Sequence, residues 1–422
     1  MKKIILPILF IFGILASTSA QFIEKCGTDE LLQDHLDRFP SLERKIQEIE
    51  NFTKNWINQN QFEASARGRE IITIPVVVHV VYQNEEENIS DLLIQSQIEV
   101  INEDFRMLNN NVQAIPSEFK SLAADIEIEF CLASVDPEGL TTSGITRTLT
   151  EIDCIANILE VKENQKPNLF YDYLGGVNAW DTERYLNIWI GNTCGRFLGA
   201  TPSPPPNPKE DGVVIDYQFT GNQCQSDSSA PYNLGRTATH EIGHYFNLYH
   251  PWKGACDDLN GDYVDDTPAQ EKEYLGCPAY PQHSCGDSDM YMNFMNYVDD
   301  RCMSMFSEGQ KMRMLAILDG PREGLKESEG CAWLAQELPF DDNAIVIYPN
   351  PAQQCIHIDF NATIEGDVIV ELKDAVGRLI FRDIESGRSF RSIDATKLSN
   401  GVYFLTFEAG KRLIIKKVLV AN

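Results

Sequence analysis

The sequence predicts a mixed α/β domain with a histidine-bearing helix, followed by a small all-β sandwich at the C-terminus. Three observations lead to this prediction. Apolar strand segments alternate with helical segments between residues 71 and 250. From Asn343 onward the chain holds only short β-type runs separated by turn signals. A chain of 422 residues is also too long to fold around a single hydrophobic core of ordinary size, so two or more domains are expected.

The first 20 residues have the pattern of a secretory signal peptide. Lys2 and Lys3 precede an apolar run over residues 4–16, and small residues lead to Ala20, so we expect cleavage before Gln21. The apolar run is too short for a membrane-spanning helix and no later stretch approaches one. We therefore expect an exported protein without a stable membrane span. The formal net charge of −28 argues against nucleic acid as a partner.

Residues 21–67 are interpreted as a propeptide. Residues 29–60 are acidic and have a helical pattern, with one face formed by Leu42, Ile46, Ile49 and Phe52. The basic sequence at 67–69 (RGR) then predicts an exposed hinge where an activating cleavage would be easy.

Residues 68–328 form the predicted catalytic domain. The apolar run at 71–82 is typical of a buried strand. Ser90 is the expected N-cap of a helix that continues to about Leu108. Alternation over 126–130 predicts a half-exposed strand, and further strands at 185–190 and 212–217 precede the histidine helix.

Residues 240–250 (HEIGHYFNLYH) predict a zinc site with a catalytic base. On a helix, His240 and His244 lie on one face about one turn apart, so they can hold a single ion. Glu241 lies roughly 100° around the helix from His240, close enough to meet a zinc-bound water without ligating the metal. If the helix ends before His250, this histidine can reach the same ion as a third ligand. The fourth position then stays open for water, which is the catalytic arrangement.

The remaining residues of this helix are expected to pack. The face opposite the histidines is formed by Ala238, Ile242, Tyr245, Phe246 and Tyr249, and Asn233 is the expected N-cap.

Here the sequence resembles the metzincin metalloproteases, whose signature is HExxHxxGxxH followed by a methionine turn. Asn247 stands where that pattern has glycine. Asparagine is the next most tolerant residue of the left-handed turn that takes the chain out of the helix. The resemblance places the methionine turn at 293–297. Met295 would form the apolar floor below the histidines, and Tyr297 would stabilise the tetrahedral intermediate.

Within the metzincins, the sequence resembles the pappalysin family from about Ile71 to Met314. Besides the zinc helix and the methionine turn, segments at 186–190, 211–215, 261–268 and 299–302 carry the resemblance. It implies a metzincin α/β (α+β) domain with a mixed sheet, a Zn2+ cofactor and protein or peptide substrates. It also implies two disulfides, Cys256–Cys285 and Cys277–Cys302.

The 11 cysteines fit an oxidising compartment, but sequence alone does not fix their pairing. Proximity in the chain suggests Cys131 with Cys154 and Cys194 with Cys224. The odd count leaves one thiol, for which Cys26 is the candidate. Residues 25–28 resemble the start of pappalysin propeptides, which implies that the Cys26 thiolate occupies the open zinc position and keeps the zymogen inactive. The alternative is a thiol that pairs elsewhere or joins a dimer.

Residues 257–267 are dense in oxygen ligands of the kind that calcium prefers, although the closing glutamate of an EF-hand is missing. The resemblance implies a Ca2+ site here with Asp262 and Thr267 among the ligands, and Asp265 is a further candidate. The alternative is a solvated acidic loop.

Residues 329–342 are polar and are interpreted as a linker, and 343–422 as a β-sandwich. This last domain resembles the C-terminal sorting domain of type IX secretion, from YPNP at 348–351 to the lysines at 416–417. The resemblance implies a partnership with the type IX secretion machinery. It also implies export through the periplasm and outer membrane to the cell surface or medium. The alternative is an ordinary binding module.

We therefore expect a secreted zinc endopeptidase with Glu241 as general base and then acid. A substrate strand is expected to run antiparallel to an edge strand near 197–201. Asp299 or Asp300 would favour Arg or Lys after the cut. Two alternatives remain: a gluzincin with Glu271 or Glu273 as third ligand, and a secreted adhesin or binding protein with a vestigial protease fold.

Overall fold

The computed structural model describes residues 24–64, 71–159, 161, 165–223, 230–257, 261–331, 345–360, 367–386, 390–410 and 412–421. The predicted signal peptide, the basic hinge at 67–69 and Cys224 lie outside these residues. Within the described part of the chain, none of the helices has the length and apolarity that crossing a bilayer requires.

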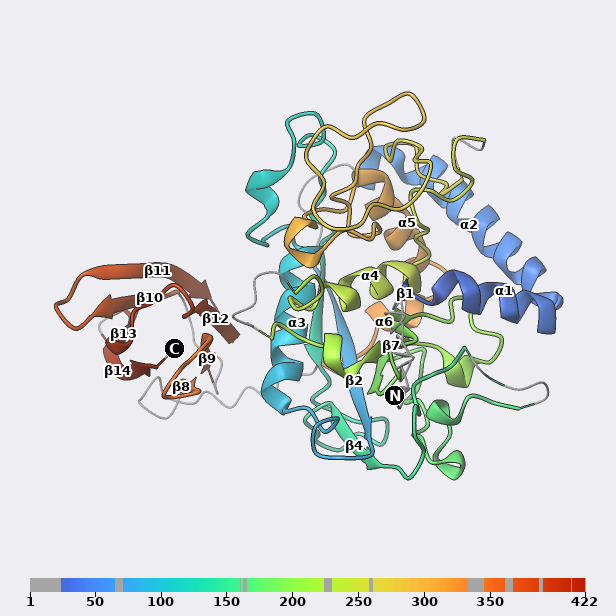
Figure 1. The fold of residues 1–422 in the computed structure, drawn as a ribbon. Coiled ribbons are helices and arrows are strands. Elements are labelled where there is room, and N and C mark those ends of the chain that lie inside the picture. Colours follow the sequence, from blue (N-terminus) through green and yellow to red (C-terminus); the bar gives the residue numbers. More distant parts are fainter. Residues whose placement is uncertain are drawn as a thin grey trace, which may run out of the picture.

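A seven-stranded mixed sheet forms the centre of the larger domain (Figure 1). Its order is β1-β6-β7-β5-β2-β3, and β4 also pairs with β2. Among the described strand pairs of this sheet, only β6–β7 is antiparallel. The strands are β1 (Glu24–Cys26), β2 (Ile72–Tyr82), β3 (Ile128–Leu132), β4 (Ile145–Leu149), β5 (Leu186–Gly191), β6 (Phe197–Ala200) and β7 (Val213–Asp216). β2 is buried nearly throughout, as its apolar run predicts.

Six α-helices surround this sheet: α1 (Thr28–Arg38), α2 (Ser41–Ala64), α3 (Asp91–Phe105), α4 (Arg236–Tyr245), α5 (Glu308–Leu318) and α6 (Glu323–Lys326). Short 3-10 turns lie at Val112–Ala114, Asn168–Phe170, Asp172–Leu174, Pro208–Glu210, Tyr217–Phe219 and Asp300–Cys302. These counts refer to the described residues. The main core packs β2, β5 and β7 against α3, α4, α5 and the methionine-rich segment 290–306.

Helix boundaries partly follow the sequence. Ser90 caps α3, and its hydroxyl accepts a hydrogen bond from the Leu93 amide at 3.2 Å. The expected cap of α4 is wrong: the helix begins at Arg236, and Gly235 with φ +78° occupies the N-cap position. The helical pattern at 29–60 is divided into α1 and α2 at Phe39-Pro40, because proline disfavours helical backbone in the residue before it.

The C-terminal part is all-β, as expected. One antiparallel sheet has the order β11-β10-β13-β14 and the other has the order β12-β9-β8. The strands are β8 (Ile345–Tyr348), β9 (Cys355–Phe360), β10 (Asp367–Asp374), β11 (Leu379–Ser386), β12 (Phe390–Asp394), β13 (Gly401–Ala409) and β14 (Arg412–Val420). The two sheets share one apolar core, in which Phe360 meets Phe407 edge to face. β12 lies next to α3, where Arg391 forms an ion pair with Glu103 at 2.8 Å (Figure 1).

The family resemblance predicted its disulfide pairs correctly, whereas proximity in the chain did not. Cys256 is bonded to Cys285 and Cys277 to Cys302, which are the pairs that the family resemblance implied. The pairings suggested by proximity in the chain are wrong, because the structure joins Cys131 to Cys331 and Cys154 to Cys194.

The sheet explains this difference. β3, which carries Cys131, lies beside β2, and Gly330 packs against Pro75 of β2. The fold therefore brings Cys331 to Cys131 across 200 residues.

Candidate metal centre

The helix α4 lies against the strand β6, which is paired with β1 on one side and β7 on the other, and this contact positions the candidate site. A Cβ atom at Gly199 of β6 would come within 2.6 Å of the Glu241 side chain and 2.9 Å of the Thr237 side chain. Glycine at this point therefore permits the close approach of strand and helix. The two histidines of α4 and Glu241 are buried.

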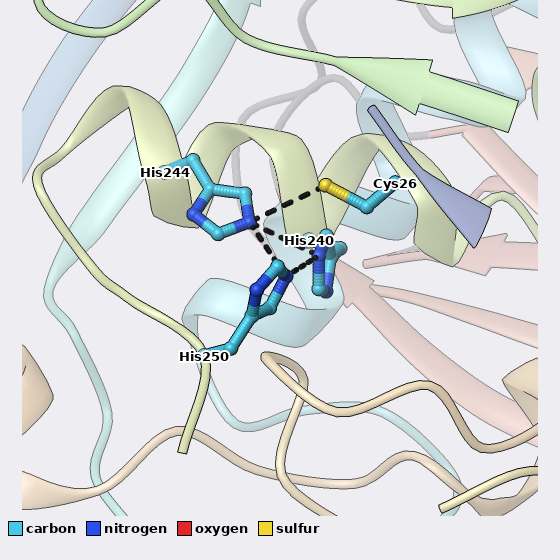
Figure 2. A group of neighbouring side chains, drawn as sticks. All are labelled: Cys26, His240, His244 and His250. Atoms are coloured by element: carbon cyan, nitrogen blue, oxygen red, sulfur yellow. Dashed lines mark hydrogen bonds between the residues drawn. The ribbon is translucent and has the colours of Figure 1, made fainter. Parts of the chain in front are cut away.

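Three imidazoles converge through their Nε2 atoms (Figure 2). The distances are 3.2 Å from His240 to His244, 3.2 Å from His240 to His250 and 3.1 Å from His244 to His250. The chain leaves the helix at Asn247, whose φ of +66° supports the proposed role of this residue in the turn. Glu271 and Glu273, the alternative third ligands, are not part of this group.

The opposite nitrogen of each ring is held by a hydrogen bond. Nδ1 of His240 donates to the Phe294 carbonyl and Nδ1 of His244 to the Leu248 carbonyl, each at 2.8 Å. Nδ1 of His250 lies 2.8 Å from a carboxylate oxygen of Asp29. Such partners fix the orientation of the rings and leave Nε2 free to bind a metal.

This arrangement fits a zinc ion. Four tetrahedral ligands at the usual Zn–N distance of about 2.0–2.1 Å would lie about 3.3 Å apart, close to the observed separations. Burial lowers the pKa of His240 well below its usual range and that of His244 to about 3. The two imidazoles are therefore neutral, which is the form that binds a metal.

Cys26 completes the group. Its Sγ atom lies 3.5 Å from Nε2 of His244, and the four ligand atoms all lie within 4.8 Å of one another. Cys26 is the last residue of β1, which pairs in parallel with β6 so that Cys26 faces Gly199. Among the described cysteines it is the free thiol.

Glu241 lies beside the three histidines. Its Oε2 accepts hydrogen bonds from the hydroxyls of Thr28 at 2.9 Å and Thr201 at 3.0 Å. Burial raises the pKa of Glu241 to about 7. A carboxyl group with this pKa can both take and release a proton near neutral pH.

Met295 and Tyr297 lie below and beside the histidines. A Cβ atom at Gly243 of α4 would come within 2.4 Å of the Met295 sulfur, so the helix rests directly on this buried side chain. The Tyr297 ring packs against those of His240 and His250, and its hydroxyl donates a hydrogen bond of 3.4 Å to the Cys26 carbonyl.

A pocket next to the metal centre holds Lys25. The ammonium group donates to the Val298 carbonyl at 2.7 Å and lies over the Tyr232 ring, 4.9 Å from its centroid. The Asp300 and Asp299 carboxylates attract it, while burial lowers the pKa of Lys25 to about 8.

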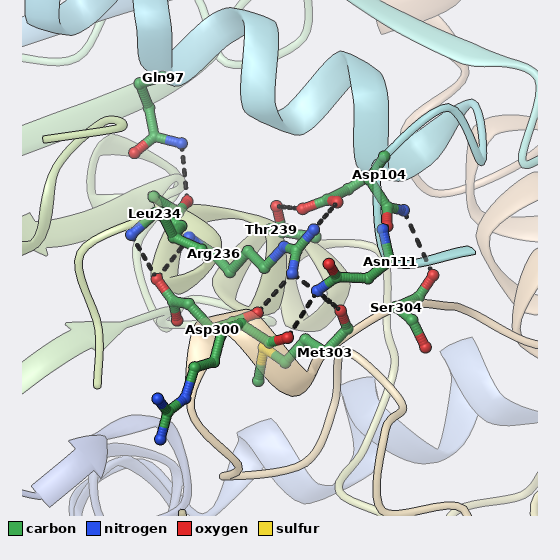
Figure 3. A network of polar contacts seen from close by, with 12 residues as sticks. Gln97, Asp104, Asn111, Leu234, Arg236, Thr239, Asp300, Met303 and Ser304 are labelled. Atoms are coloured by element: carbon green, nitrogen blue, oxygen red, sulfur yellow. Dashed lines mark hydrogen bonds and ion pairs between the residues drawn. The ribbon is translucent and has the colours of Figure 1, made fainter. Parts of the chain in front are cut away.

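A polar network fixes Asp300 to the start of α4 (Figure 3). Its Oδ2 accepts from the backbone amides of Leu234 at 2.9 Å and Arg236 at 3.3 Å. The Arg236 guanidinium continues the network to Asp104 of α3.

The expected calcium ligands are only partly brought together. The Thr267 hydroxyl donates to Asp262 at 2.5 Å, and both residues are buried. Asp265 is exposed, whereas the neighbouring Asp266 accepts from the Ser307 hydroxyl at 2.6 Å.

The residues that sequence reasoning missed lie mainly before residue 65. Thr28 contacts Glu241, Asp29 contacts His250, and Glu50 of α2 contacts Arg313 of α5. The signal for two of them was that Thr28 and Asp29 follow Cys26 by two and three residues. Nothing in the sequence marked Glu50.

Comparisons with known proteins identify the families that the two parts of the chain resemble. Residues 176–319 match the family described as pregnancy-associated plasma protein-A, and residues 346–421 match a secretion system C-terminal sorting domain. An extracellular metalloprotease of Arthroderma benhamiae is 30% identical over 249 residues, which cover 58% of this chain and 76% of the relative. One of Sordaria macrospora is 38% identical over 143 residues, covering 33% of this chain and half of the relative's length.

Two solved structures are also similar. Mature mirolysin of Tannerella forsythia in complex with a cleaved peptide is 42% identical, with a TM-score of 0.55, over 63% of this chain and 98% of that one. A promirolysin mutant from the same organism is 39% identical, with a TM-score of 0.59, over 73% of this chain and 99% of that one.

The fold and the histidine cluster thus define a metalloprotease of the metzincin class. The chain belongs to the pappalysin family within that class and carries a secretion sorting domain, so its destination is the extracellular space or the cell surface.

Proposed function

We propose that this protein is a secreted zinc endopeptidase, made as a zymogen, that cleaves peptide bonds before basic residues. The observation that carries the proposal is the convergence of the Nε2 atoms of three imidazoles beside the buried carboxyl group of Glu241. The intact Glu241 argues against a vestigial site, because a structural metal site has no use for a base there.

His240, His244 and His250 would hold the zinc ion, which when bound polarises water and the scissile carbonyl. Glu241 takes a proton from the attacking water and delivers it to the leaving amine. The Tyr297 hydroxyl donates a hydrogen bond to the developing oxyanion. The Asp29 carboxylate keeps the His250 ring in place as long as residues 21–67 remain attached.

Residues 21–67 act as a propeptide in this proposal. The Cys26 thiol would occupy the fourth metal position, and the Thr28 hydroxyl binds the carboxylate of the base. β1 runs parallel to β6, whereas a substrate is expected to run antiparallel to it. The peptide bonds of 25–27 are therefore presented in the reverse direction, which protects them from hydrolysis.

Lys25 supports the proposed specificity. Its buried ammonium group is attracted by Asp300 and Asp299 and binds the Val298 carbonyl. After removal of the propeptide, the same groups would accept Lys or Arg of a substrate at the position after the cut. The acidic loop at 257–267 is proposed to bind calcium, and the C-terminal sandwich to engage the type IX secretion machinery.

The test compares the full chain after removal of residues 21–67 with its Glu241→Ala variant. We expect hydrolysis of a denatured protein mixture to fall by about 10²- to 10⁴-fold in the variant, with zinc content unchanged. Glu183→Ala, which changes an exposed carboxylate, is the matched control. Zinc bound in both proteins without turnover in either would refute the proposal.

A further inference from the structure

A second charged pocket lies beside the metal centre, where α2 packs against α5. The buried Arg313 of α5 donates to Glu50 of α2 through both Nη atoms, at 3.0 and 2.8 Å. The Asn247 side-chain amide and the Tyr249 hydroxyl donate to the same carboxylate at 2.9 and 3.1 Å. Four donors thus surround one carboxylate group in the geometry that arginine forms with such anions.

The rest of the pocket is aromatic and positively charged. The Arg313 guanidinium lies 5.5 Å from the ring centroid of Tyr249 and 5.4 Å from that of Tyr263. The ammonium group of Lys253 lies 3.2 Å from the Tyr249 ring centroid. Within the catalytic domain, Asp262 is the negatively charged residue that faces Arg313 and Lys253. Once Glu50 departs, two cations face one carboxylate.

The pocket is physically joined to the metal centre. Asn247 and Tyr249 belong to the short loop that carries His250, and the Lys253 amide donates to the His250 carbonyl at 3.0 Å. Arg313 itself donates to the Asn247 carbonyl at 2.9 Å. Arg313 would retain this contact without the propeptide, so the pocket does not depend on Glu50 for its shape.

Asn247 acquires a second role from this arrangement. Its backbone, with φ +66°, needs only a residue that tolerates the left-handed region, and glycine satisfies that requirement best. Glycine would have no side-chain donor for the carboxylate. The asparagine of this chain therefore serves the turn and the pocket together.

We propose that the pocket formed by Asn247, Tyr249, Lys253 and Arg313 is a carboxylate-binding subsite of the active enzyme, filled by Glu50 in the zymogen. Its ligand after activation is an Asp or Glu side chain of the polypeptide substrate. This inference rests on the proposed endopeptidase function. It adds a preference for an acidic substrate residue at a distance from the cleaved bond. Acidic substrates gain charge-assisted hydrogen bonds there that their neutral counterparts lack.

The test measures binding without turnover. Full-length Glu241→Ala protein is cut at 67–69 with trypsin and separated from its propeptide. Fluorescence anisotropy then gives the affinity of labelled peptides with one central lysine, in which a single Glu or its Gln counterpart is moved one position at a time. We expect about tenfold tighter binding for Glu than for Gln at one position along the peptide.

Three further variants localise the effect. Tyr249→Phe removes one donor and Asn247→Gly removes another while preserving the turn, so each should reduce the Glu-to-Gln affinity ratio several-fold. Tyr173→Phe, which changes an exposed tyrosine elsewhere, should leave the ratio unchanged. Equal affinity for Glu and Gln at every position, or an unchanged ratio in both pocket variants, would overturn the proposal. Failure of the proposed endopeptidase function would show separately, as absent cleavage of these peptides by protein that retains Glu241.

Discussion

The thiol sulfur of Cys26 lies 3.5 Å from Nε2 of His244, within the group of atoms formed by the three imidazoles. It is delivered there by a three-residue strand that extends the catalytic sheet by one strand at β6. The free thiol and the histidine helix, 218 residues apart in the chain, are thus neighbours because of strand pairing.

Replacing Cys26 with alanine should weaken latency without abolishing it. The contacts of Thr28, Lys25 and Glu50 remain in the variant, so the propeptide stays docked but loses its proposed metal ligand. We expect the lag before full activity of the secreted full chain to shorten by about tenfold. The lag is measured by continuous hydrolysis of a quenched peptide. A Cys26→Ala protein that also carries Glu241→Ala is the control for contaminating proteases, and an unchanged lag would contradict the proposed role.

Replacing His250 with alanine should distinguish the metzincin site from one completed by a glutamate. In the activated protein only His240 and His244 would remain as ligands, so we expect loss of zinc during dialysis and loss of activity. The uncleaved protein should retain more zinc, because Cys26 still provides a third ligand. His283→Ala, at an exposed histidine, is the control. Zinc and turnover retained in activated His250→Ala would favour Glu271 or Glu273 as the ligand.

Replacing Asp300 with asparagine should reduce the preference for a basic residue after the cut. The amide oxygen can still accept from Leu234 and Arg236, while the charge that attracts Lys25 is removed. The ratio of kcat/KM for a lysine peptide to that for its norleucine counterpart should fall by about tenfold or more. Asp299→Asn, at the second carboxylate near Lys25, is expected to have the smaller effect. An unchanged ratio in both variants would show that the preference arises elsewhere.

Much of the catalytic core could be predicted because its signals are local. The spacing of His240, Glu241 and His244 depends on helix geometry alone, and the exit at Asn247 depends on one backbone conformation. The buried strand β2 follows from an uninterrupted apolar run. Each of these predictions needs only a few consecutive residues.

The contacts made by the proposed propeptide could not be predicted in this way. The pairing of Glu50 with Arg313 spans 263 residues and depends on how α2 packs against α5. The Cys131–Cys331 disulfide likewise depends on the position of Gly330 beside β2. Proximity in the sequence does not predict such pairs, because the order of the strands in the sheet decides which residues come into contact.

Removing the Cys131–Cys331 disulfide should destabilise the catalytic domain more than removing Cys154–Cys194. The first closes a loop of 200 residues and the second a loop of 40, so the loop-entropy contributions are about 5 and about 4 kcal/mol. Double serine variants of each pair, made in the Glu241→Ala background, would be compared by thermal unfolding. A larger loss of Tm in the 154/194 variant would contradict the loop-entropy argument.

His79 provides a prediction about pH that is independent of the metal centre. It is buried in β2, where its ring nitrogens lie 2.9 Å from Asn187 Oδ1 and 2.7 Å from the Thr146 hydroxyl. Burial lowers the pKa of His79 from 6.5 to about 4. As the pH falls below 6.5, the unfolded chain takes up this proton first, so the free energy of unfolding decreases until the folded protein also protonates near pH 4.

The contribution of His79 is therefore complete above pH 6.5 and decreases by about 2 kcal/mol between pH 7 and pH 5. His79→Gln can still donate to Asn187 and accept from Thr146, but it has no proton to take up. Urea unfolding of the full chain at the two pH values, again in the Glu241→Ala background, should show a smaller acid-induced loss in the variant. His35 and His357, whose pKa values burial also lowers to about 4, are present in both proteins and cancel in this comparison. Equal losses in the two proteins would mean that His79 is not held neutral by the fold.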